Sequence, residues 1–104
     1  MDDYYILDGS TPYQAIILSL SSESLSDNFT NITKELKLRN IKGNILLDYY
    51  GYTQDNKNRF FEMFFDENNF IFSSFKKATV DKNTKYLINS FFEHESEKYK
   101  NMKI

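Results

Sequence analysis

The stretch from Gly43 to Phe75 constrains the fold most strongly, because three short apolar runs alternate there with two polar turns. The runs are Asn44–Tyr50, Arg59–Asp66 and Phe70–Phe75, and each has the length of a β-strand. They are rich in Phe, Tyr and Ile, which fit a pleated surface. The pattern therefore predicts a three-stranded meander at the centre of the fold.

Two further apolar runs, Tyr4–Leu7 and Tyr13–Leu20, precede the meander. The segment between them contains Gly9 and Pro12, which favour a turn, so we expect the two runs to pair as a hairpin. The centre of the second run, residues 15–18, is apolar on both faces. Such a run is typical of a strand inside a sheet.

A helix is predicted over residues 25–39, between the hairpin and the meander. Apolar residues recur there at spacings of four, three and four, which is the period of one helix face: Leu25, Phe29, Ile32 and Leu36. Asn40 and Gly43 follow this stripe. Both residue types tolerate left-handed backbone, which commonly ends a helix.

A second helix is expected to begin near Asp81 or Asn83, either of which can cap it. Its buried stripe is expected to contain four apolar residues: Leu87, Ile88, Phe91 and Phe92. The predicted order of elements is β-β-α-β-β-β-α. This order predicts a single α+β domain over residues 1–104, in which two helices pack on a face of a largely antiparallel sheet of four to five strands.

Composition argues against several classes of protein. The chain has 104 residues and no Cys, so it forms neither a disulfide nor a thiolate metal site. Its formal charge of −2, from 15 acidic and 13 basic residues, does not suit a non-specific nucleic-acid binder. No apolar run approaches membrane-spanning length, and the acidic N-terminus lacks the core of a secretory signal. We therefore expect a soluble, cytoplasmic protein.

No motif assembles a catalytic or metal site, and we expect no cofactor. His94 is the only histidine and lies in the charged stretch E-H-E-S-E without companion ligands. Glu93, Glu95 and Glu97 alternate by two, so they do not share a helix face. A small carboxylate-dependent enzyme is the weakest alternative, because nothing selects a pair of carboxylates.

Asp48 interrupts an otherwise apolar strand, and a lone carboxylate is costly to bury. One interpretation is an ion pair with a cation such as Arg59 on a neighbouring strand. The other is an acidic and aromatic surface patch formed by Asp48, Tyr50, Tyr52 and Asp55, to which Asp66 and Glu67 add. Tyrosine gives large contact area at interfaces, and carboxylates suit a basic partner.

The meander resembles antitoxins of the RnlB type in two short motifs, G-N-I-L-L-D at Gly43–Asp48 and N-R-F at Asn58–Phe60. The likeness extends back over the first predicted helix and forward to Phe75. Those antitoxins bind and silence the ribonuclease toxin RnlA. The chain departs from their pattern after Gly51, where a Tyr-Thr-Gln-Asp loop replaces an Asn-Gly turn. The small size, acidity and abundant Asn, Lys and aromatic residues also resemble immunity proteins of contact-dependent growth inhibition.

Both resemblances imply the same task, the neutralisation of a toxin. They imply a non-enzymatic protein that binds a basic nuclease toxin one-to-one, without a cofactor and without direct contact to nucleic acid or membrane. The expected toxin-binding residues are those of the surface patch: Asp48, Tyr50, Tyr52, Asp55, Asp66 and Glu67. The alternative of another class is a structural or regulatory homodimer module that uses an exposed sheet edge.

Overall fold

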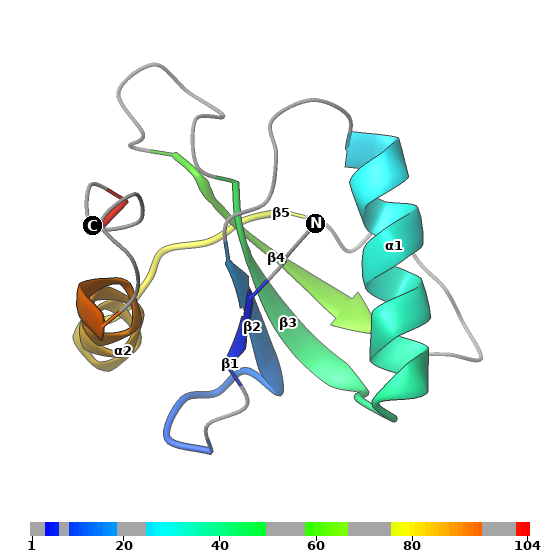
Figure 1. Cartoon of the computed structure of the whole chain (residues 1–104), viewed down its shortest axis with the longest axis horizontal. Helices are drawn as coiled ribbons and strands as arrows, with labels where there is room; N and C mark the ends of the chain where they lie inside the picture. The colour runs from blue at the N-terminus through cyan, green and yellow to red at the C-terminus, as the bar shows by residue number, and fades with distance from the viewer. Residues whose placement is uncertain (1–3, 7–8, 19–24, 50–57, 67–75, 95–101) are drawn as a thin grey trace.

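One sheet lies between two helices (Figure 1). The computed structural model describes residues 4–6, 9–18, 25–49, 58–66, 76–94 and 102–104, with the backbone alone for residues 4–6 and 25–29. Helix α1, Leu25–Leu38, and helix α2, Lys82–His94, cover opposite faces of the sheet. The predicted α+β class is confirmed, whereas the expectation that both helices share a face is wrong.

In the described part of the chain the sheet has five strands, in the spatial order β1-β2-β3-β4-β5. Their bounds are Tyr4–Ile6 (β1), Ala15–Leu18 (β2), Gly43–Asp48 (β3), Phe60–Phe65 (β4) and Lys76–Lys77 (β5). β2 and β3 run parallel, while the other neighbouring strands pair antiparallel. The prediction of a largely antiparallel sheet is therefore right only in part, because the sheet is mixed.

The parallel pair follows from the position of α1 in the chain. A parallel connection needs a long crossover, and α1 supplies it between β2 and β3. Ala15–Ile17 of β2 lie beside Ile45–Leu47 of β3, and all these residues are buried. Such continuous apolar runs are typical of strands covered on both faces. The predicted N-terminal hairpin is confirmed, since β1 pairs antiparallel with β2.

The last strand agrees with the predicted order of elements only in part. The strand expected at Phe70–Phe75 lies outside the described residues. β5 begins at Lys76, where a loop was predicted, and pairs with Phe61 and Glu62 of β4. The N–H of Ala78 continues this pairing by donating to the carbonyl of Phe60 at 3.0 Å. These bonds satisfy backbone groups along the outer edge of β4.

α1 ends in a Schellman motif. The N–H of Ile41 donates to the carbonyl of Leu36 at 2.9 Å, and the N–H of Asn40 donates to that of Lys37 at 3.1 Å. Asn40 takes a left-handed φ of 55°, and Ile41 packs against the core cluster that contains Leu36. The predicted role of Asn40 at the helix stop is confirmed.

α2 begins at an N-cap, Asp81, as predicted. The Oδ1 atom of Asp81 accepts a hydrogen bond of 2.7 Å from the N–H of Thr84, and the carbonyl of Asp81 accepts one of 2.9 Å from the N–H of Lys85. The backbone hydrogen bond from Thr84 lowers the pKa of the Asp81 carboxyl, because it stabilises the charged form. The cap starts a helix whose Ile88 and Phe92 side chains are fully buried.

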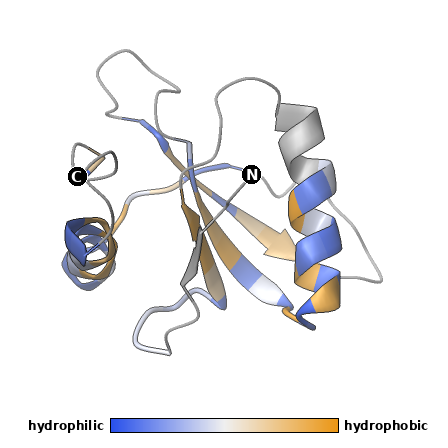
Figure 2. Cartoon of the chain, in the orientation of Figure 1, coloured by the Kyte–Doolittle hydropathy of each residue, from blue (hydrophilic) through white to orange (hydrophobic). Residues whose placement is uncertain are grey.

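The sheet divides the core into two clusters, one under each helix (Figure 2). The cluster on the α1 side contains Ala15, Ile17, Ile32, Leu36, Ile45, Leu47, Tyr49, Phe61, Met63 and Phe65. The cluster on the α2 side contains Ile16, Leu18, Leu46, Phe60, Ile88 and Phe92. The predicted stripe of the first helix is confirmed at Ile32 and Leu36, while the side chains of Leu25 and Phe29 lie outside the described part. No helix in that part is long and apolar enough to span a membrane.

Gly43 is the first residue of β3 and has a φ of 118°, a backbone conformation that residues with a side chain rarely adopt. A Cβ atom there would lie 2.7 Å from Cγ of Gln14. We expect Gly43→Ala to lower the free energy of unfolding by about 1–3 kcal/mol, the usual cost of strained backbone. Gly9→Ala is the matched control, because a Cβ at Gly9 meets nothing within 4 Å. Urea titration of both variants tests this, and equal stabilities would contradict it.

Candidate functional site

Asp48, the first residue of the predicted patch, is buried at the end of β3. Its side chain is 0% exposed, and one carboxylate oxygen lies 3.0 Å from Nε of Arg59, which is 2% exposed. Of the two interpretations of Asp48, the structure supports the ion pair with Arg59. Asp48 therefore presents no carboxylate to a partner at the surface.

Arg59 connects three parts of the chain. Its guanidinium contacts Asp48 on β3, donates through Nη2 to the carbonyl of Met102, and lies 5.0 Å from the ring centre of Phe60. Its own carbonyl accepts a hydrogen bond of 2.8 Å from the N–H of Tyr49. Arg59 therefore links the end of β3, the residues just before β4 and the C-terminal segment.

Burial raises the pKa of the Asp48 carboxyl to about 7, while the nearby guanidinium of Arg59 acts in the opposite direction. Burial has the larger effect because the carboxylate loses nearly all contact with water. Among the described residues, neither oxygen of Asp48 accepts a hydrogen bond of ordinary geometry. The ion pair consequently compensates the buried charge only in part.

The other predicted contact residues are not brought together by the described structure. Tyr50, Tyr52, Asp55 and Glu67 lie outside the described residues. Asp66 is half-buried and follows Phe65, whose partner in β3 is Gly43. Asp48 pairs with Phe60, at the other end of the same two strands. Asp48 and Asp66 therefore lie at opposite ends of the β3–β4 pair.

A polar bridge crosses the α2 side of the sheet. The hydroxyl of Tyr13 donates to one oxygen of Glu62 at 3.1 Å, and the other oxygen of Glu62 lies 3.2 Å from Nζ of Lys76. Burial, with the hydrogen bond to Glu62, raises the pKa of Tyr13 to about 12. These contacts link the start of β2 to β4 and β5, so we assign the bridge a role in holding strands together.

The outer side of α2 forms a surface that sequence reasoning missed. A hollow of about 220 Å³ is lined by Tyr86, Asn89, Ser90, Glu93 and Lys103. The first four belong to α2, and Lys103 belongs to the C-terminal segment, residues 102–104. Their spacing on α2 carried a signal, because Tyr86, Asn89 and Glu93 recur at three and four residues on the side turned away from the buried stripe.

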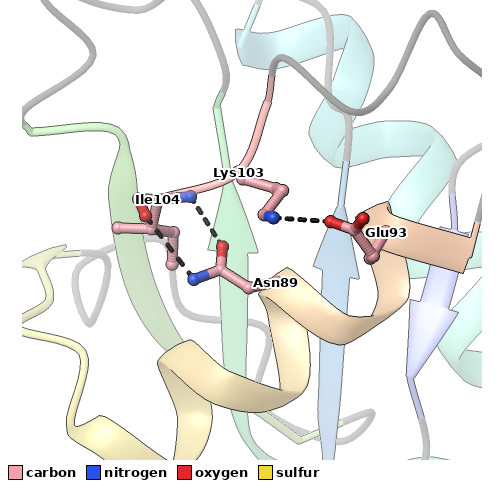
Figure 3. Close-up of polar contacts among 4 residues, drawn as sticks. All are labelled: Asn89, Glu93, Lys103 and Ile104. Carbon is pink, nitrogen blue, oxygen red and sulfur yellow. Dashed lines mark hydrogen bonds and ion pairs between the residues drawn. The ribbon is translucent and has the colours of Figure 1, made fainter.

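Side chains of α2 hold the C-terminal segment in place (Figure 3). The Asn89 amide accepts a hydrogen bond of 2.7 Å from the N–H of Ile104 and donates to its carbonyl at 3.5 Å. Nζ of Lys103 lies 2.5 Å from a carboxylate oxygen of Glu93. His94 is the exposed last residue of α2. Within the described residues, no three His, Cys, Asp or Glu side chains are placed to hold a metal ion.

The described elements form a small α+β protein in which one mixed sheet lies between two helices. The chain belongs to the RnlB antitoxin family, whose model is described as antitoxin to bacterial toxin RNase LS or RnlA and matches residues 14–103. Membership supports the first of the two resemblances and gives the chain an antitoxin role with a cognate toxin as its partner. The chain matches no curated protein and no solved structure.

Proposed function

We propose that this protein binds a toxin of the RNase LS or RnlA kind and blocks its ribonuclease activity in a one-to-one complex, without catalysis of its own. The observation that carries this proposal is the extent of the family match, residues 14–103. That range runs from β2 to the C-terminal segment and includes both helices and both core clusters. The likeness therefore covers both helices and the strands β2 to β5, and not one local motif.

The buried Asp48–Arg59 pair changes which predicted contact residues we retain. Asp48 lies inside the core and pairs there with Arg59, so we assign it a structural role and do not retain it as a contact residue. Tyr50, Tyr52, Asp55 and Glu67 stay proposed contacts, and Asp66 is a weaker one because it lies at the far end of the strand pair from Asp48. We propose that their carboxylates and rings face a basic surface of the toxin.

Co-expression with a toxin of this family tests the proposed function. We expect the toxin alone to degrade cellular RNA and stop growth, and the pair to grow and to co-purify with equal molar amounts of both chains. In titration calorimetry, Asp55→Lys is expected to weaken binding, whereas Glu35→Lys on α1, where the side chain is 37% exposed, is the matched charge control. Continued RNA degradation in the presence of the folded protein, with no complex, would contradict the proposal.

A further inference from the structure

The solvent side of α2 combines an exposed ring with a hollow. Among the described residues, four large apolar side chains are exposed, and Tyr86 is one of them at 75%. It lines the hollow of about 220 Å³ together with Asn89, Ser90, Glu93 and Lys103. Tyrosine beside a concavity is the usual composition of the central contacts in protein interfaces.

The hollow has a second wall that does not belong to the helix. Lys103 reaches it from the C-terminal segment and pairs with Glu93, while the next residue, Ile104, is held by Asn89 (Figure 3). The same segment is attached to the core through Arg59, which donates to the Met102 carbonyl. A wall fixed at several points needs little further ordering when a partner binds, which favours affinity.

Two exposed lysines of α2 lie near Tyr86. Lys82 lies one turn before Tyr86 on the same side of α2, and Lys85 precedes it directly; both are exposed. Glu93 is the acidic residue that lines the hollow, and it is paired with Lys103. Among the described residues of this surface, the three lysines Lys82, Lys85 and Lys103 outnumber the two carboxylates of Asp81 and Glu93, although the whole chain has a formal charge of −2. Complementarity calls for carboxylates on the partner.

We propose that this surface, formed by Lys82, Lys85, Tyr86, Asn89 and the C-terminal segment, docks an acidic segment of the cognate toxin. An apolar side chain of that segment enters the hollow beside Tyr86, and neighbouring carboxylates meet Lys82 and Lys85. The inference rests on the proposed function and adds to it, because it assigns a second contact with the opposite charge to the one expected from Asp55.

The test is titration calorimetry of the full chain with a purified toxin of the RNase LS or RnlA kind. We expect Tyr86→Ala to weaken binding about tenfold or more, as for a residue central to an interface. The double variant Lys82→Glu/Lys85→Glu is expected to weaken binding at low salt, with a smaller effect at high salt because exposed charges are screened. Asn89→Ala, which frees the Ile104 backbone, is expected to weaken binding less.

Helix α1, on the opposite face of the sheet, provides matched controls. Leu38→Ala removes an apolar side chain that is 82% exposed at the end of α1, and Lys34→Glu/Lys37→Glu reverses two exposed lysines beside it. These variants are expected to bind like the wild type, and circular dichroism checks that all variants are folded. If the wild type binds and the α2 variants bind equally well, or if only the α1 variants lose affinity, the docking surface is overturned. If the wild type itself does not bind, the proposed function fails instead.

Discussion

Replacing Arg59 with Met is expected to lower the free energy of unfolding by about 3–5 kcal/mol at pH 8, the range for removing one member of a buried ion pair. The Met side chain fills similar space but leaves Asp48, which is 0% exposed, without its cation. It also removes the donor to the Met102 carbonyl. The loss is expected to be smaller at pH 5, because Asp48, with a pKa of about 7, is then already protonated in the wild type and no ion pair is left to break.

Arg39 provides the control for this substitution. Its Nε lies 2.8 Å from a carboxylate oxygen of Glu35, a contact much like that of Arg59 with Asp48, but both side chains are more than a third exposed. Arg39→Met is expected to cost less than about 1 kcal/mol, as exposed pairs do. If Arg59→Met does not fold, the double variant Asp48→Leu/Arg59→Met is expected to recover stability, because it buries no charge. Equal effects of Arg39→Met and Arg59→Met in urea titrations would contradict this account.

The second large effect is a fall in stability as the pH rises. The pKa of Asp48 in the folded chain is raised from 3.8 to about 7, so the folded state holds this proton more tightly than the unfolded state. The stabilisation is therefore fully present below the ordinary pKa of 3.8 and is lost as the pH rises towards 7. Three pKa units correspond to roughly 4 kcal/mol.

Asp48→Asn isolates this effect from all other titrating groups. The amide has the shape of the protonated acid and does not ionise, so the variant is expected to match the wild type near pH 4. Between pH 4 and pH 8 the variant is expected to become more stable than the wild type by a few kcal/mol. The reason is that it has no carboxyl group at position 48 whose deprotonation lowers the free energy of unfolding. Urea titrations at four pH values measure the difference. A variant that instead loses stability relative to the wild type as the pH rises would mean that Arg59 keeps Asp48 ionised.

The local elements of this fold could be predicted because their signals lie close together in the chain. The spacing of Ile32 and Leu36, the caps at Asn40 and Asp81, and the alternating faces of β3 each depend on a few neighbouring residues. The parallel pairing of β2 with β3 could not be predicted in the same way. An apolar run indicates that a strand is buried, but it does not indicate which strand lies beside it or in which direction.

The candidate surfaces, too, depend on contacts between residues that are distant in sequence. The sequence offered two interpretations of Asp48, and only the position of Arg59 in space decides between them. The surface on α2 depends on contacts of Asn89 and Glu93 with residues 103 and 104, ten to fifteen positions further along the chain. Amide and carboxylate side chains form such contacts with many partners, so composition and periodicity do not reveal them.

The parallel pairing of β2 with β3 also has a consequence for how the chain folds. Two antiparallel units, β1–β2 and β3–β4, each join strands that follow one another in sequence, and each can form early from local contacts. Their junction brings residues 15–17 beside residues 45–47, across the whole of α1. Bringing these two sets of residues together costs conformational entropy of the intervening chain before any contact between the strands has formed. We therefore expect the central seam of the sheet to be the last part to assemble, although it is the most deeply buried part once formed.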